Sequence, residues 1–175
     1  MDPRWKHPFP ALVAGPTCCG KSQFVRRLLE SAEDMIDGAP ENISWCYSVY
    51  QPAYDEMLKT LPNITFVERV PGDLETLINP SIRNLVVIDD LMHELSNDQR
   101  MTNLFTKGYH HRNLSVIFIL QNIFHRGKEL RDMSLNVMIQ MNLAKKEIYR
   151  SKKNGVLQSE NQWQIWYRTQ AIFHT

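Results

Sequence analysis

One segment constrains this chain more than any other: Gly15-Pro16-Thr17-Cys18-Cys19-Gly20-Lys21-Ser22. It has the pattern G-x-x-x-x-G-K-[S/T], in which glycines begin and end a tight loop and a lysine and a hydroxyl residue follow. The apolar run Pro10–Ala14 precedes the loop. Apolar residues recur behind it at helical spacing: Phe24, Val25, Leu28 and Leu29. The pattern therefore predicts a strand, a loop and a helix over residues 21–32, rather than a chance match in an ordinary turn.

A loop of this kind binds phosphate groups. Its backbone N–H groups and the positive end of the following helix surround the phosphates. Lys21 is then expected to reach the β- and γ-phosphates, and the Ser22 hydroxyl to bind Mg²⁺. Cys18 and Cys19 stand where glycine or serine is commoner, so we expect one backbone position with positive φ to carry a Cβ atom. Oxidation of these thiols would block nucleotide binding, although the simpler interpretation is that both are small residues that fill the loop.

Apolar runs alternate with helical patterns along most of the chain. This alternation is typical of a three-layer α/β domain with a mainly parallel sheet. We expect further strands at 43–50, 64–67, 85–88, 116–120 and 137–141, with 64–67 on an edge of the sheet. Helices are expected at 54–59 and at 97–109, the second capped by Ser96. Residues 1–143 are predicted to form the core, and 144–175 a divergent basic and aromatic tail that is either separate or part of the same domain.

Two aspartates directly follow the predicted strand at 85–88. The carboxyl ends of parallel strands lie at the same edge of the sheet as the glycine loop, so Asp89 and Asp90 can approach a bound phosphate group. Asp89 is expected to hold the metal through water or through Ser22. Asp90 is expected to orient and deprotonate the attacking water, with Glu94 as the reserve candidate. A helix N-cap is the alternative role for the pair.

Gln121 ends the next predicted strand. An amide there can bind the γ-phosphate or the attacking water, or it can simply cap the strand. Phosphoryl transfer also benefits from an arginine, supplied in cis or by a neighbouring subunit. Three arginines flank this strand, and spacing does not choose among them: Arg112, Arg126 and Arg131. The pair His110-His111 is more typical of a surface than of a metal site, because no third ligand lies at a matching spacing.

Bulk properties narrow the choice of partners and location. The 175 residues, of which 43% are hydrophobic, suffice for one core, and 20 basic against 19 acidic residues leave a net charge of +1. Any nucleic-acid contact must therefore come from a local patch. A basic run can supply one or can be a solvated helix: Lys145, Lys146, Arg150, Lys152 and Lys153. No apolar run approaches the ~20 residues of a membrane span and no signal peptide is evident, so an intracellular, soluble protein with reduced cysteines is expected.

Three segments together resemble a known family. They are Ala14-Gly15-Pro16-Thr17 with Lys21-Ser22, Val87-Ile88-Asp89-Asp90-Leu91-Met92, and the block that runs from His111 to Asn122. In these the chain resembles the genome-packaging ATPases of large DNA viruses and of the virus-like Maverick/Polinton elements, within the FtsK–HerA group of P-loop motors. The likeness extends from Pro8 to Asn136 and includes Arg131.

The resemblance implies a RecA-like P-loop ATPase core of the additional-strand type, with a strand between the two strands that carry the nucleotide-binding motifs. It also implies a homo-oligomeric ring that pumps double-stranded DNA into a preformed capsid, in the host cytoplasm or nucleus or in association with the virion. In that family Lys21 and Ser22 would bind ATP and Mg²⁺, Asp89 and Asp90 would form the second acidic site, and Gln121 would be the sensor. Arg131 is the first choice for an arginine finger that acts on a neighbouring subunit.

Two other functions remain open at this point. A small-molecule kinase would use the same lysine and aspartates to transfer phosphate to a bound acceptor, but no arginine-rich lid segment is evident and Gln121 favours hydrolysis. A nucleotide-binding protein without motor activity is the other alternative, and its support comes only from the divergent tail.

Overall fold

The computed structural model describes residues 4–91, 113–121, 137–141, 157–158 and 163–167, and the structural statements below concern these residues. Several predictions fall on other parts of the chain. The helix at 97–109 with its cap Ser96, the candidates Glu94, His110, His111, Arg112, Arg126 and Arg131, and the basic run at 145–153 all lie outside the described residues.

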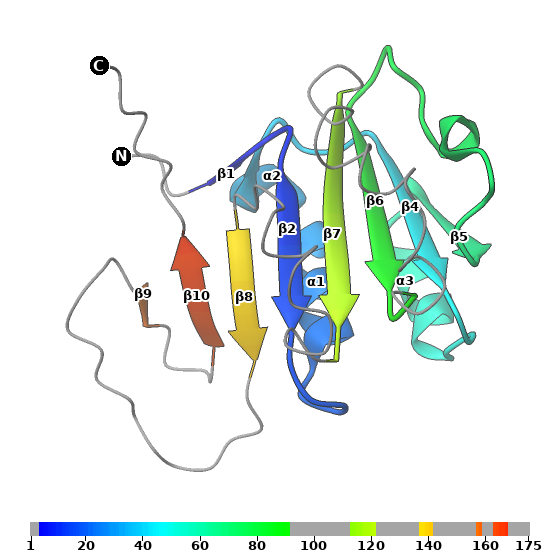
Figure 1. The fold of residues 1–175 in the computed structure, drawn as a ribbon. Helices are drawn as coiled ribbons and strands as arrows, with labels where there is room; N and C mark the ends of the chain where they lie inside the picture. Colours follow the sequence, from blue (N-terminus) through cyan, green and yellow to red (C-terminus); the bar gives the residue numbers. More distant parts are fainter. Residues whose placement is uncertain (1–3, 92–112, 122–136, 142–156, 159–162, 168–175) are drawn as a thin grey trace.

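One sheet organises the described chain, with its strands in the order β5-β4-β6-β7-β2-β8-β10-β9 (Figure 1). The strands are β2 (Pro10–Ala14), β4 (Asn42–Tyr47), β5 (Ile64–Glu68), β6 (Asn84–Asp89), β7 (Leu114–Leu120), β8 (Val137–Met141), β9 (Leu157–Gln158) and β10 (Trp163–Tyr167). The strands from β5 to β8 pair in parallel, whereas β10 is antiparallel to both β8 and β9. Because β7 lies between β2 and β6, the predicted additional-strand arrangement is confirmed.

Apolar runs explain why β2, β6 and β7 lie in the interior of the sheet. Every residue of β2, β6 and β7 is buried, as continuous apolar sequences in a parallel sheet require. Alternate residues of β2 enter two separate cores, with Ala11 and Val13 on one face of the sheet and Leu12 and Ala14 on the other. Strand β5 has exposed positions and lies at the end of the sheet, so its predicted edge position is confirmed.

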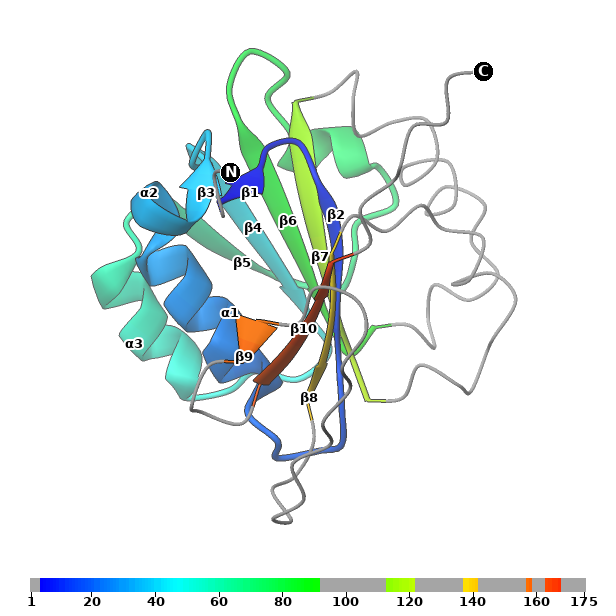
Figure 2. The ribbon, with the colours of Figure 1, turned by 90° about the vertical axis from the view of Figure 1, so that its left-hand side faces the viewer.

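The described helices α1 (Lys21–Glu30), α2 (Ala32–Met35) and α3 (Ala53–Thr60) lie on one face of the sheet (Figure 2). A short 3₁₀ turn, η1 (Leu74–Leu77), precedes β6. Helix α1 packs on the sheet through its buried residues Val25, Leu28 and Leu29. The single helix predicted for 21–32 is interrupted at Ser31, whose backbone (φ −110°, ψ 25°) is not helical.

Strand β4 is shorter than predicted, since it ends at Tyr47 rather than at residue 50. Pro52 follows closely and begins the turn into α3, which ends the extended backbone. A second difference concerns the tail. The aromatic segment Trp163–Tyr167 forms β10, a strand that the sequence analysis did not predict and that joins the main sheet beside β8.

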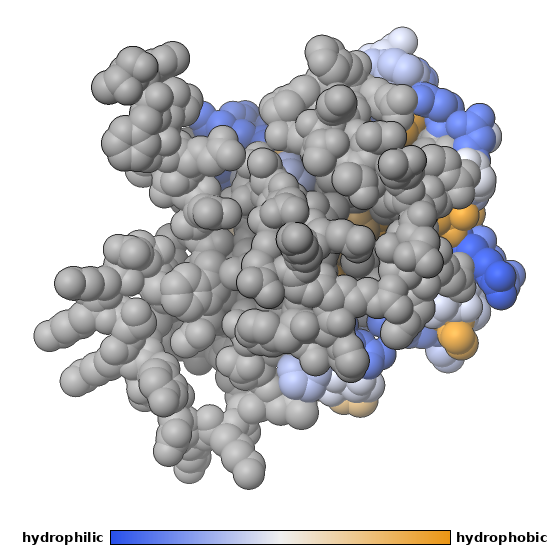
Figure 3. Space-filling model, viewed as in Figure 1, coloured by the Kyte–Doolittle hydropathy of each residue, from blue (hydrophilic) through white to orange (hydrophobic). Residues whose placement is uncertain are grey.

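A small second sheet lies near the N-terminus, where β1 (Trp5–Lys6) pairs in parallel with β3 (Ile36–Asp37). On the described surface in Figure 3, hydrophobic residues are scattered among hydrophilic ones. In the described chain as a whole, the exposed large hydrophobic residues are Met35, Val49, Tyr50 and Leu58. No helix within the described ranges is both long and apolar enough to cross a membrane.

Candidate functional site

The glycine loop connects the end of β2 to the start of α1, at the edge of the sheet where the parallel strands end (Figure 1). Gly15 N donates a hydrogen bond of 3.1 Å to Leu120 O and so ties the loop to β7. Gly20 has φ 89° immediately before α1, and Cys18 has φ 61°. The expectation that a residue with a Cβ atom occupies a left-handed position in this loop is therefore confirmed at Cys18.

Most backbone N–H groups of the loop are available to a ligand. Within the described chain, Gly15 and Cys19 are the loop residues whose N–H groups donate to a backbone acceptor, the latter to Pro16 O at 3.4 Å. Gly20 caps α1 without a side-chain hydrogen bond, and the first turn of the helix has no acidic residue. The first N–H groups of a helix have no partner inside it and lie at its positive end. The residues present therefore fit an anionic phosphate group.

Lys21 folds back over this loop. Its Nζ donates to Gly15 O and to Pro16 O, each at 2.9 Å. The ammonium group is thus held at the start of the loop by two neutral acceptors and has no carboxylate partner among the described residues. A cation held in this way can exchange carbonyl contacts for phosphate oxygens, which are the stronger acceptors.

Ser22 and Asp89 bring the loop and the end of β6 together. Ser22 Oγ donates to Asp89 Oδ2 at 3.1 Å, and Asp89 is only 6% exposed. Burial raises the pKa of Asp89, the hydrogen bond from Ser22 lowers it, and the neighbouring charge of Asp90 raises it. A hydroxyl and a carboxylate at this place are the hard oxygen ligands that suit Mg²⁺.

The described residues contain no cluster of three or more His, Cys, Asp or Glu that could hold a metal ion by themselves. Mg²⁺ is commonly held by one or two protein carboxylates, with water and substrate phosphates as its other ligands. The pair Ser22 and Asp89 fits this mode of binding beside a phosphate loop.

Asp90 and Gln121 form a second, exposed pair at the same edge. Gln121 Nε2 donates to Asp90 Oδ2 at 2.6 Å, and Asp90 N donates to Ile119 O at 3.1 Å. Asp90 has φ 55°, a left-handed conformation that aspartate tolerates better than most residues. The turn directs the Asp90 side chain across the end of β7 to Gln121. The structure thus brings together the two residues for which the sequence predicted water activation and sensing.

One residue of this region was not predicted as part of the site. The hydroxyl of Tyr54, on α3, donates to Asp89 Oδ2 at 3.5 Å. Tyr54 is 1% exposed, and its pKa is raised first by burial and then by the charge of Asp89. The hydroxyl therefore keeps its proton and acts as a donor. Sequence reasoning placed Tyr54 in a helix, but no local signal pointed to a contact 35 residues away.

No protein-family model matches this sequence, and no curated protein matches it in sequence. Solved structures do match its fold. The DNA-packaging ATPase B204 from Sulfolobus turreted icosahedral virus has a TM-score of 0.55 and 11% identity, over 83% of this chain and 79% of that one. The genome packaging NTPase B204 from Sulfolobus turreted icosahedral virus 2, in complex with AMPPCP, has a TM-score of 0.54 and 10% identity, over 83% and 78%.

A third similar structure is EssC (ATPases 2 and 3) from Geobacillus thermodenitrificans, with a TM-score of 0.57 and 12% identity, over 90% of this chain and 39% of that one. At these identities the similarity establishes the fold. The chain has the RecA-like fold of P-loop ATPases, with a mainly parallel sheet, as the sequence analysis predicted.

Proposed function

We propose that this chain binds ATP with Mg²⁺, hydrolyses it, and works as a subunit of a motor that moves double-stranded DNA during genome packaging. The observation that carries the proposal is the hydrogen bond of 3.1 Å between Ser22 and Asp89, which joins the phosphate loop to the acidic end of β6. The fold similarity to a DNA-packaging ATPase, and to a packaging NTPase bound to an ATP analogue, supports it.

Phosphate binding follows from the loop. The backbone N–H groups from Thr17 to Ser22, other than that of Cys19, would surround the β- and γ-phosphates, with the positive end of α1 adding to their attraction. Lys21 would leave Gly15 O and Pro16 O and donate to the phosphate oxygens, which carry the negative charge that the loop carbonyls lack.

Hydrolysis needs a metal ligand set and a base. Ser22 and Asp89 would hold Mg²⁺, which when bound neutralises part of the negative charge of the phosphates. Asp90 is exposed at the edge of the sheet and would accept the proton of an attacking water. Gln121, which already donates to Asp90, would hold that water or the γ-phosphate through its amide. Arg131 of a neighbouring subunit remains the predicted arginine finger.

The motor role requires macromolecular partners. As a motor subunit, the chain would form a homo-oligomeric ring around double-stranded DNA, would work next to viral capsid proteins and would need no membrane. The sequence resemblance to packaging ATPases supports this role, and so does the similarity in fold to B204 over most of both chains.

ATP hydrolysis with and without double-stranded DNA tests the proposal. The purified chain should release phosphate from ATP in the presence of Mg²⁺, and DNA should raise the rate several-fold. Lys21→Ala should abolish both, because it removes the only described cation at the phosphate loop. Lys59→Ala is the matched control, since Lys59 pairs with Glu56 on the exposed side of α3.

The outcomes separate the parts of the proposal. A rate of hydrolysis that DNA does not change would contradict the motor role, and the chain would then be an ATPase without that role. ATP binding that Lys21→Ala removes, without any turnover, would contradict hydrolysis and leave a nucleotide-binding protein. Equal loss in Lys21→Ala and Lys59→Ala would contradict the assignment of the loop itself.

A further inference from the structure

We propose that Tyr54 is a positioning residue, which holds the carboxylate of Asp89 in the orientation that binds Mg²⁺ beside the nucleotide. The inference rests on the proposed function, because it assigns a task to a residue that supports the same site. It starts from a convergence of two donors from different helices. Ser22 Oγ, from α1, and the hydroxyl of Tyr54, from α3, both donate to Asp89 Oδ2, at 3.1 and 3.5 Å.

The ring of Tyr54 is fixed by its neighbours, so its hydroxyl has a defined direction. It stacks on Phe66 of β5, with ring centroids 4.5 Å apart and an interplanar angle of 22°. Three further aromatic rings lie at centroid distances of 5.3 to 6.0 Å: Tyr47, Tyr50 and Trp45. Aromatic pairs at such distances are favourable beyond the area that they bury. An aromatic cluster therefore determines where the donor points.

Tyr54 also offers the right chemical group for this task. A tyrosine hydroxyl carries a proton at neutral pH and can donate it in a hydrogen bond. Asp89 is buried, and a buried polar group needs hydrogen-bond partners. The indole of Trp45 is also buried beside Asp89 and acts on its charge, but its Nε1 lacks the geometry of a hydrogen bond to any described residue. Ser22 and Tyr54 are the described side chains whose hydroxyls donate to the carboxylate.

These two donors differ in what else they do. In the proposed function Ser22 is itself a metal ligand, so its oxygen has a second task. Tyr54 has no other assigned task and reaches Asp89 from α3, an element outside the phosphate loop. Groups that hydrogen-bond to metal ligands fix the ligand orientation, and their loss commonly weakens metal binding. Tyr54 fits this description for Asp89.

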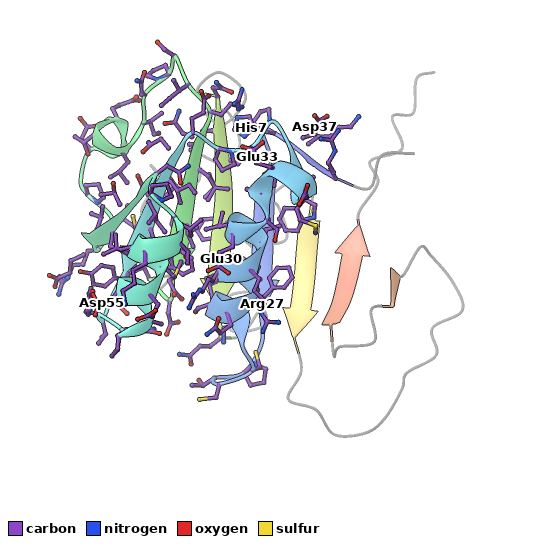
Figure 4. The ribbon with its side chains drawn as sticks, turned by 180° about the vertical axis from the view of Figure 1, so that it is seen from behind. His7, Arg27, Glu30, Glu33, Asp37 and Asp55 are labelled. Carbon is purple, nitrogen blue, oxygen red and sulfur yellow. The ribbon has the colours of Figure 1, made fainter. Side chains whose placement is uncertain are left out.

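The test is Tyr54→Phe, which removes one oxygen atom and keeps the stacked ring. Its matched control is Tyr50→Phe. Tyr50 belongs to the same aromatic cluster, but its hydroxyl donates to Asp55 at 2.5 Å and not to Asp89. Asp55 lies on α3 at the outer edge of the molecule (Figure 4). Each protein is titrated with a fluorescent ATP analogue at fixed Mg²⁺, in EDTA, and over a series of Mg²⁺ concentrations. Thermal unfolding is recorded in parallel.

We expect Tyr54→Phe to raise the Mg²⁺ concentration for half-maximal binding by about threefold to tenfold, as loss of one hydrogen bond of ordinary strength predicts. Binding in EDTA should match that of the unaltered chain, because the loop N–H groups and Lys21 are intact. A purely structural role would weaken binding equally with and without the metal. Tyr50→Phe should leave all three titrations unchanged.

Two binding results would overturn the inference alone. One is a Mg²⁺ dependence of Tyr54→Phe equal to that of the unaltered chain. The other is a loss of affinity that is the same in EDTA and in Mg²⁺. Failure of the unaltered chain to bind the analogue under any condition would overturn the proposed function and this inference together. If Tyr54→Phe unfolds at a much lower temperature than Tyr50→Phe, the hydroxyl serves the fold and the positioning role is likewise overturned.

Discussion

Replacing Cys18 by glycine should make the protein more stable, although it removes a side chain. Cys18 has φ 61°, where the Cβ atom of an L-residue is crowded, and this conformation costs roughly 1–2 kcal/mol. Glycine removes the crowding but raises the entropy of the unfolded chain, which offsets about 0.5–1 kcal/mol. The thiol of Cys18 is exposed, so little packing is lost. The free energy of unfolding should therefore rise by about 0.5 kcal/mol.

Cys19→Gly is the matched control, with the same chemical change one residue further on. Cys19 is not among the described residues with positive φ, and its side chain packs partly buried against the main core. Glycine there relieves no crowding, loses packing worth about 1 kcal/mol and adds the same unfolded-state entropy. Cys19→Gly should therefore lower the free energy of unfolding by about 1.5–2 kcal/mol.

The two variants should change stability in opposite directions, with a difference of about 2 kcal/mol. For a chain of this size that difference corresponds to roughly 4–8 °C in the unfolding midpoint. Thermal unfolding followed by circular dichroism, together with urea titration, measures it. Equal destabilisation by both variants would refute the reasoning from φ, and would mean that the loop takes another conformation in solution.

Two further predictions concern the opposite end of the sheet, where Figure 4 labels His7. His7 hydrogen-bonds through Nε2 to Asn113 Oδ1 (2.8 Å) and through Nδ1 to Ser115 Oγ (2.6 Å), and burial lowers its pKa below the usual value near 6.5. The unfolded chain then takes up a proton more readily than the folded chain does. The contribution of His7 to stability should therefore be complete above about pH 6.5 and should be lost as the pH falls through its lowered pKa. Urea titrations of His7→Gln should lack this step. Asn84 is fully buried, and its side chain makes hydrogen bonds with Asn42 and with the backbone of residues 79 and 82. Asn84→Ala should therefore lower the free energy of unfolding by about 3 kcal/mol. For comparison, Asn63→Ala removes one hydrogen bond to Pro40 and should lower it by about 1 kcal/mol.

The sequence predicted the parts of this fold that depend on local pattern. Continuous apolar runs identified β2, β6 and β7, because a strand buried on both faces is mostly apolar, with polar residues near its ends. The glycine loop was recognisable because its conformation depends on residues that are adjacent in sequence. The break at Ser31 was missed, since serine is compatible with a helix and tertiary packing decides where α1 ends.

Contacts between distant segments were harder to predict. The contact of Tyr54 with Asp89 joins α3 to β6 and appears only when both are packed on one sheet. Strand β10 was missed for a related reason. Its pairing partner β8 lies more than twenty residues earlier in the chain, and an aromatic run by itself does not specify a partner.

The two adjacent aspartates show how the end of one strand can produce two different carboxylates. Asp89 still belongs to β6 and is buried between the hydroxyls of Ser22 and Tyr54. At Asp90 the backbone turns to φ 55°, so the next side chain leaves the core and reaches the amide of Gln121 in solvent. A buried carboxylate with fixed donors suits a metal ion, and an exposed one beside an amide suits proton transfer with water. The turn at Asp90 thus gives a physical reason for the division of roles in the proposed hydrolysis, which the sequence Asp89-Asp90 alone does not contain.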